Sequence, residues 1–130
     1  MRTDAMSLAA FRFSEDHYWF HLRDSVWVVG LTDFAQTSLG TFVSISLPLP
    51  GAWFQRGDPI GEIESLKATS SLEAPLSCMV IEINLELEEG PSLINDDPYG
   101  DGWLLKVEPD RAEDVTRLLD YQEYLALVEQ

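Results

Sequence analysis

The fold of this chain is decided by residues 60–83, whose sequence is IGEIESLKATSSLEAPLSCMVIEI. Apolar and polar side chains alternate over residues 62–67 and again over residues 81–85, and a period of two is typical of half-buried strands. The small polar residues 68–71 show no helical pattern and suit a turn between the two arms. The stretch therefore predicts a hairpin with Lys67 near its tip and its side chain in water.

Lys67 is one of only two lysines, the other being Lys106, in a chain with 23 acidic residues. A lone lysine in so acidic a chain is a poor candidate for a role in solubility. A primary amine on a flexible stem is also a good attachment point for an acyl group. Position alone nevertheless favours an ordinary hydrated surface lysine, so the neighbouring residues have to decide between the two interpretations.

Length and composition indicate one globular domain. The chain has 130 residues, of which 45% are apolar, and this is enough for one hydrophobic core but too few residues for two domains. We expect the domain to span residues 11–130, after a flexible segment of residues 1–10. No apolar run is long enough to span a bilayer, and the N-terminus lacks the apolar core of a signal peptide. These features predict a cytoplasmic protein that binds no membrane.

The formal net charge of −15 limits the possible partners. Like charges repel, so nucleic acid and anionic membranes are unfavourable partners. The charge fits docking onto basic patches of enzymes, where opposite fields speed encounter. Solubility, or adaptation to a salty cytoplasm, explains the same charge equally well.

The sequence offers no constellation for catalysis or metal binding. Cys78 is the only cysteine, so an internal disulfide is excluded, and we expect it to be a small buried or turn residue. With His17 and His21 as the only histidines, a Cys/His zinc site is implausible. No spacing indicates a Ser-His-Asp or Cys-His arrangement. We therefore predict a protein that is not itself an enzyme.

The other segments predict a mainly β protein with short helices. Residues 11–32 predict an opening hairpin with its turn at residues 24–25, and residues 41–47 and 103–107 predict further strands. Residues 52–59 and 92–102 are expected to be a connector and a loop.

Short helices are expected at three places, each with recognisable end signals. The first is residues 34–39, which Thr32-Asp33 cap and Gly40 ends in the left-handed conformation. The second is a brief segment from Asn84 to Leu87. The third is a C-terminal helix, or two helices parted near Asp120, that starts with a capping box formed by Asp110 and Glu113.

The segment around Lys67 resembles the lipoyl-attachment segment of the glycine cleavage system H protein family. Members of that family have the motif E-S-V-K-A, followed by a short spacer and then by a small residue, Pro, an aliphatic residue and Ser-Gly. This chain has ESLKA at residues 64–68 and APLS at residues 74–77. Further blocks match in the same order over roughly residues 11–128, which makes the resemblance more specific than one motif. These blocks are His17 with Trp19, VGLTD at 29–33 with Ala35-Gln36, Leu39-Gly40, Leu47-Pro48 with Pro50-Gly51, Gly57-Asp58, DPYG at 97–100 with Gly102-Trp103, and LLD at 118–120 with Tyr124.

The resemblance implies a fold, a cofactor and a set of partners. The fold is the lipoyl-domain barrel-sandwich hybrid, with a short internal helix and a C-terminal helix. The cofactor is lipoate joined covalently to Lys67 as N6-lipoyllysine, and the lipoylating enzymes (lipoate-protein ligase or lipoyl transferase) recognise the residues beside it. Those cofactor-site residues are Glu64, Ser65, Leu66 and Ala68, although Glu64 also fits a plain solvated strand face.

A lipoyl carrier of this type works as a swinging arm. In glycine cleavage the arm accepts an aminomethyl group from glycine decarboxylase and passes it to the aminomethyltransferase, and dihydrolipoamide dehydrogenase reoxidises the arm. The cofactor supplies the chemistry and the protein places it, while the tether raises the local concentration at each active site. A monomer suits such a shuttle, so we expect one.

This chain also departs from the family pattern. Tyr18 and Ser71 stand where the family has acids that are associated with holding the aminomethyl-loaded arm, while Phe34 and Thr41 replace a frequent His and the usual Asp. An amine in a partly dry cleft needs a carboxylate partner, which Tyr18 and Ser71 cannot supply. Three interpretations stay open: Asp16 or Glu73 compensates, the cleft is more apolar and less suited to an amine, or the departures are ordinary drift that protects the amine less well but adequately.

These departures leave other functions open. H-protein relatives also serve as lipoate-binding proteins of cytoplasmic sulfur oxidation, beside heterodisulfide-reductase-like complexes, and a sulfur adduct carries no ammonium that needs an acid. A lipoyl donor that relays the group to other acceptors is a third hypothesis. An unmodified interaction module is the rival from another class.

Overall fold

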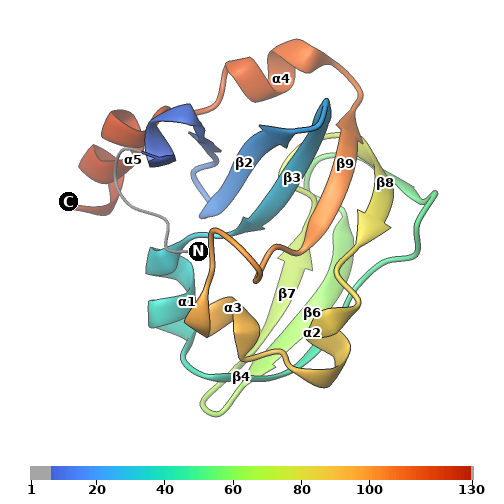
Figure 1. Ribbon diagram of the computed structural model, residues 1–130, viewed down its shortest axis with the longest axis vertical. Helices are drawn as coiled ribbons and strands as arrows, with labels where there is room; N and C mark the ends of the chain where they lie inside the picture. Colours follow the sequence, from blue (N-terminus) through green and yellow to red (C-terminus); the bar gives the residue numbers. More distant parts are fainter. Residues whose placement is uncertain (1–6, 130) are drawn as a thin grey trace.

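Two antiparallel sheets make up the body of the protein in the computed structural model, which describes residues 7–129 (Figure 1). This agrees with the predicted mainly β class. In order across the larger sheet the strands are β1 (Arg12–Phe13), β2 (Tyr18–Arg23), β3 (Val26–Leu31), β9 (Leu105–Pro109), β8 (Cys78–Ile83) and β5 (Trp53–Phe54). The smaller sheet consists of β4 (Phe42–Ser46), β6 (Pro59–Ser65) and β7 (Thr69–Glu73).

Short helices surround the sheets. They are the 3₁₀ helix η1 (Ser7–Ala10) and the α-helices α1 (Asp33–Leu39), α2 (Glu86–Glu89), α3 (Leu93–Asp96), α4 (Ala112–Thr116) and α5 (Tyr121–Val128). None of the helices within residues 7–129 is long and apolar enough to cross a membrane. Of the segment predicted to be flexible, residues 1–6 lie outside the described residues, whereas Ser7–Ala10 is ordered as η1 and buries Leu8.

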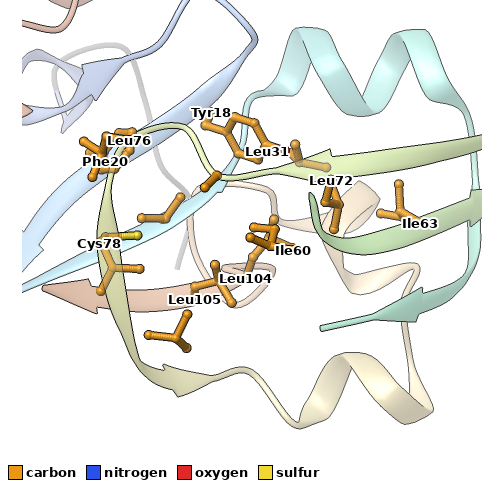
Figure 2. Close-up of a cluster of buried hydrophobic side chains, with 14 of the residues drawn as sticks. Tyr18, Phe20, Leu31, Ile60, Ile63, Leu72, Leu76, Cys78, Leu104 and Leu105 are labelled. Carbon is orange, nitrogen blue, oxygen red and sulfur yellow. The ribbon is translucent and has the colours of Figure 1, made fainter. Parts of the chain in front are cut away.

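The main core lies between the two sheets (Figure 2). Strand β2 contributes Tyr18 and Phe20 to it, and the smaller sheet contributes Ile63 and Leu72. All four residues are buried, and the most exposed of them, Tyr18, is only 5% exposed. The free Cys78 lies in the same core, as predicted for a small buried residue.

A second, smaller core covers the outer face of β2 and β3. Trp19 points away from its neighbours Tyr18 and Phe20 because side chains alternate along a strand. Its indole lies directly over Gly30, where a Cβ atom would come within 2.6 Å of the ring. Tyr124 of α5 packs on the same face, with its ring stacked on Phe13 at a centroid distance of 4.7 Å. The C-terminal helix therefore covers this part of the sheet.

The pairing of the central hairpin differs from the prediction. Strand β6 pairs with β7, which is formed by the small polar residues that were expected to be the turn. The predicted second arm lies in β8, which pairs with β9 and β5 in the larger sheet. Of the β7 residues only Leu72 is buried, so the strand shows too little apolar alternation to be recognised from its sequence.

The predicted hairpin with its turn at Asp24-Ser25 is present, and both turn residues have positive φ. Two C-terminal helices parted at Asp120 are also present, but the capping box is formed by Asp120 and Glu123 of α5, not by Asp110 and Glu113. Pairing of the Asp120 carboxylate with the Glu123 amide satisfies a free N–H at the start of the helix.

Three smaller predictions were wrong in detail. The expected loop 92–102 contains α3, and the expected connector 52–59 contains β5. Gly40 ends α1 with φ +93°, but its ψ of −167° is extended and not left-handed helical. These short elements are held by contacts far along the chain, which local sequence patterns do not reveal.

We predict that Gly30→Ala lowers the free energy of unfolding by about 1–3 kcal/mol, because the new methyl group collides with the buried Trp19 indole. Chemical denaturation with fluorescence detection measures the change. Gly90→Ala is the matched control, since its Cβ atom would be 3.8 Å from the nearest atom found, the Glu86 carbonyl oxygen. Equal losses in the two variants would contradict the prediction.

Candidate functional site

Lys67 lies exposed in the tight turn that joins β6 to β7. The last paired residues before the turn are Glu64 and Thr69, and the Ser65 amide then donates to the Ala68 carbonyl at 2.7 Å. The lysine is thus at the tip of a hairpin, as its sequence context predicts. In Figure 1 this tip projects at the bottom of the view, beyond the body of the smaller sheet.

The Ser65 side chain holds the turn from the inside. It is only 7% exposed, although it follows an exposed Glu64. Its hydroxyl oxygen accepts from the amides of Ala68 at 3.1 Å and Lys67 at 3.3 Å, and the hydroxyl donates to the Ala68 carbonyl at 3.2 Å. One side chain therefore satisfies the backbone groups that a tight turn leaves without partners.

The turn rests on the segment that follows α1. The Leu66 amide donates to the Thr41 carbonyl at 3.0 Å. The lysine stem passes over Gly40, where a Cβ atom would come within 3.2 Å of the Lys67 Cε atom. The missing side chain and the positive φ of Gly40 together leave room for this stem.

Asn95 of α3 fixes that segment in place. Its Nδ2 donates to the Gly40 carbonyl and to Gln36 Oε1, each at 2.9 Å, and its Oδ1 accepts from the Phe42 amide at 2.9 Å. Three side-chain hydrogen bonds thus tie α1, α3 and the start of β4 together beneath the lysine. Sequence analysis missed Asn95, and nothing in the surrounding polar sequence distinguishes it from a loop residue.

The other residues predicted to flank the cofactor are brought to the same tip. Glu64 and Ala68 are exposed, and Leu66 is 77% exposed. Ser65 points inward and supports the turn. The surface offered beside the lysine amine is therefore made by Glu64, Leu66 and Ala68.

The Lys67 amine has no carboxylate within 4.0 Å anywhere in residues 7–129, where Lys106 with Glu82 is the one salt bridge. The same part of the chain holds no group of three His, Cys, Asp or Glu residues that could bind a metal ion. No histidine or cysteine there hydrogen-bonds a serine hydroxyl, and Cys78 is buried. The site can present an amine, and it has no nucleophile and base arranged to catalyse a reaction.

The residues that depart from the family pattern do not share one environment. Tyr18 points into the main core, and this burial raises the pKa of Tyr18 to about 12. Its hydroxyl accepts from the Glu73 amide at 3.1 Å, and this hydrogen bond partly opposes the rise. Ser71 is exposed on β7, and Phe34 is 42% exposed on α1. Asp16 and Glu73, the acids that sequence analysis offered as substitutes, are both exposed.

His17 links the start of α1 to the C-terminal helix. Its Nδ1 lies 2.8 Å from the Tyr124 hydroxyl, which lies 2.7 Å from the Thr32 hydroxyl that caps α1. Its ring packs on Phe34 at a centroid distance of 4.7 Å. Burial lowers the pKa of His17, and the nearby Asp16 partly opposes this effect. This network steadies the helix that leads to Gly40.

Comparison with known proteins gives a consistent result. Residues 11–130 match the family described as Glycine cleavage H-protein. The chain is 43% identical over 119 residues to the glycine cleavage system H protein of Carboxydothermus hydrogenoformans, covering 92% of each chain. It is 47% identical over 117 residues to the probable glycine cleavage system H protein of Natronomonas pharaonis, covering 90% of this chain and 92% of the relative. The crystal structure of a glycine cleavage system H protein from Mycobacterium marinum is similar with a TM-score of 0.83 and 34% identity, covering 94% of this chain and 98% of that one.

We predict that Ser65→Ala lowers the free energy of unfolding by roughly 1–2 kcal/mol, because the part-buried hydrogen bonds from the Lys67 and Ala68 amides lose their acceptor. Denaturant titration measures this loss. Ser44→Ala is the control, since Ser44 is an exposed serine on the neighbouring strand β4. An unchanged Ser65→Ala midpoint would show that the hydroxyl does not hold the turn.

Alkaline pH should reveal the buried Tyr18 proton. The folded pKa of about 12 exceeds the ordinary value of 10.0, so the folded state holds this proton more tightly. The resulting stability is fully present below pH 10 and is lost as the pH rises towards 12. Tyr18→Phe should therefore flatten the fall in unfolding free energy over this window, by up to about 1.4 kcal/mol per pH unit. If the unfolding free energy falls equally with pH in the wild type and in Tyr18→Phe, this explanation is refuted.

Proposed function

Because this chain belongs to the glycine cleavage H-protein family, whose members are lipoyl carriers and not catalysts, we propose that Lys67 is the residue that carries lipoate. The observation that carries the proposal is the exposed, unpaired amine of Lys67 at the tip of the β6–β7 turn. Glu64, Leu66 and Ala68 beside it form the surface that a lipoate-protein ligase or lipoyl transferase would recognise.

The second lysine does not fit this role. Lys106 lies within β9, its amine is 3.4 Å from a Glu82 carboxylate oxygen, and it sits 5.1 Å from the centre of the Trp103 ring. An amine held by an ion pair and an aromatic ring is a poor acceptor for an acyl group, because reaction would break both contacts. Of the two lysines, only Lys67 therefore offers a suitable amine.

When bound, lipoate supplies a disulfide that can be reduced, loaded and reoxidised. The role of the protein itself is to position the lysine that would carry the group. Ser65 fixes the turn, and Asn95 fixes the Gly40 segment under the lysine stem. A rigid base with a flexible arm lets the protein present its cargo to successive active sites at high local concentration.

The first proposed set of partner enzymes is that of glycine cleavage. The arm would receive an aminomethyl group from glycine decarboxylase, deliver it to the aminomethyltransferase, and be reoxidised by dihydrolipoamide dehydrogenase. Family membership supports this set, and the relatives reported above are named for the same system. The acidic chain, with a net charge of −15, suits basic docking surfaces on these enzymes.

One observation favours a second set of partner proteins. Tyr18 is neutral and buried, and Ser71 is neutral, so neither can pair with the ammonium of an aminomethyl cargo. A sulfur adduct would not need such an acid, as expected for a lipoate-binding protein beside a heterodisulfide-reductase-like complex. The relatives reported above give this alternative no support.

We predict that Lys67→Arg abolishes lipoylation, because a guanidinium keeps the charge but cannot accept the acyl group. Lys106→Arg is the matched control and should be lipoylated like the wild type. Intact mass with peptide mapping, on protein purified from its native host, measures the modification. An unmodified Lys67 in cells that make lipoate would overturn the assignment of this residue as the carrier. If the arm is present, an aminomethyl adduct on it would indicate the glycine cleavage enzymes, and a sulfur-bearing adduct would indicate the alternative partners.

A further inference from the structure

The chain that follows α1 supports the backbone of the lysine turn. The Leu66 amide, in the turn, donates to the Thr41 carbonyl at 3.0 Å. The next residue of that chain, Phe42 of β4, is paired with Ser65, the last residue of β6. Residues 40–42 therefore hold the turn from outside the β6–β7 hairpin, in addition to the hydrogen bonds that the hairpin makes within itself.

The stem of Lys67 lies along the same segment. A Cβ atom placed on Gly40 would be 3.2 Å from the lysine Cε atom and 3.6 Å from each of its Cγ and Cδ atoms. Three successive methylene groups thus follow the backbone of Gly40. A lysine side chain has many rotamers, and ordering it costs free energy when a partner binds. A stem that is already ordered presents its amine to an enzyme at a smaller cost.

Asn95 of α3 is the side chain that fixes this support. Its Nδ2 donates to the Gly40 carbonyl and to Gln36 Oε1, each at 2.9 Å, and its Oδ1 accepts from the Phe42 amide at 2.9 Å. Asn95 thus holds the backbone on both sides of the Thr41 carbonyl that receives the turn. In Figure 1, α3 lies beside α1 and above β4, as these contacts require.

The helix that carries Asn95 is itself anchored in the main core. Its residue Ile94 is fully buried there. The backbone of α3 also packs closely on Gly102, where a Cβ atom would come within 2.8 Å of the Ile94 Cα atom and of the Leu93 carbonyl oxygen. Because α3 has only four residues, such tertiary contacts must hold it in place. Asn95 therefore links the lysine turn to the core of the protein.

We propose that Asn95 is a positioning residue for the acylation of Lys67, because it fixes the segment along which the lysine stem lies. This inference rests on the proposed function. Asn95 does not contact the amine and acts through Gly40 and Thr41. Without it the amine stays exposed, but the turn and the stem adopt more conformations, of which the lipoylating enzyme binds only some. The loss should therefore appear in the capture of the protein, as a higher KM, and not in kcat.

The test measures lipoylation of the full-length variant Asn95→Asp by a purified lipoate-protein ligase with lipoate and ATP. In this reaction the Lys67 amine attacks the carbonyl carbon of lipoyl adenylate, an amide bond forms, AMP leaves with the bonding electrons, and the amine proton passes to solvent. The new carboxylate faces the Gly40 carbonyl and Gln36 Oε1, so two attractive contacts become repulsive. We expect the KM for the protein to rise about fivefold or more, with kcat nearly unchanged.

Hydrogen exchange gives a readout that does not depend on any enzyme. The Leu66 amide is protected by its bond to the Thr41 carbonyl, and Asn95 fixes that carbonyl. We expect this amide to exchange about tenfold or more faster in Asn95→Asp, because the turn opens more often. Nuclear magnetic resonance measures the exchange residue by residue.

The matched control is Asn84→Asp, at the end of β8 in the larger sheet. The Asn84 amide also makes three hydrogen bonds, two donated to the carbonyls of Asp101 and Trp103 and one accepted from the Glu86 amide. This substitution should lower the stability of the protein, since Asn84 is buried, but should leave the KM and the exchange of the Leu66 amide unchanged.

A milder variant keeps the test decisive if Asn95→Asp does not fold. Gln36→Ala removes one acceptor of the Asn95 amide from a half-buried position in α1, where alanine is favourable. It should change the KM and the Leu66 exchange in the same direction by a smaller factor.

Two results would overturn the proposal. One is an unchanged KM and an unchanged Leu66 exchange in both Asn95→Asp and Gln36→Ala, at a temperature where circular dichroism shows that the variant is folded. The other is an equal effect of Asn84→Asp, which would assign the loss to stability alone. A failure of the proposed function is seen separately, as a wild type whose Lys67 carries no lipoyl group after the reaction, and the exchange of the Leu66 amide tests Asn95 in that case too.

Discussion

The hydrogen bonds of the Asn95 side chain are the constraint on which the functional end of this protein depends. A buried or half-buried amide must satisfy both its donor and its acceptor, and Asn95 does so only when Gln36, Gly40 and Phe42 are all in place. These groups come from α1 and β4, some 55 residues earlier in the chain. The segment they fix receives the Leu66 amide and the Lys67 stem, so the lysine is positioned by the tertiary structure and not by its own hairpin alone.

Features that depend on neighbouring residues could be predicted from the sequence. The turn at Asp24-Ser25, the Thr32 cap of α1 and the exposed position of Lys67 follow from local residue preferences, and the structure has all three. The partner of β6 could not be predicted, because β7 has one buried residue and its polar side chains resemble those of a turn. Asn95 is beyond local analysis for the same reason, since its partners are fixed only by the folded chain.

Strand β2 shows how one run of residues serves two cores. Tyr18 and Phe20 face the space between the sheets, while Trp19 faces the opposite side and needs Gly30 to be without a side chain. Because successive residues of a strand point to opposite faces, Tyr18 can only be a core residue here. Its hydroxyl then finds one partner, the Glu73 amide, at the end of β7. A tyrosine at this position thus strengthens the contact between the sheets but brings no charge to the surface.

The described part of the chain joins few of its charges in ion pairs, and this suits a carrier that must leave each partner. Exposed charges act over about 10 Å at moderate salt and speed encounter, but they add little to the lifetime of a complex. Lifetime depends instead on desolvated apolar contacts. A carrier built this way finds its partners quickly and releases them quickly.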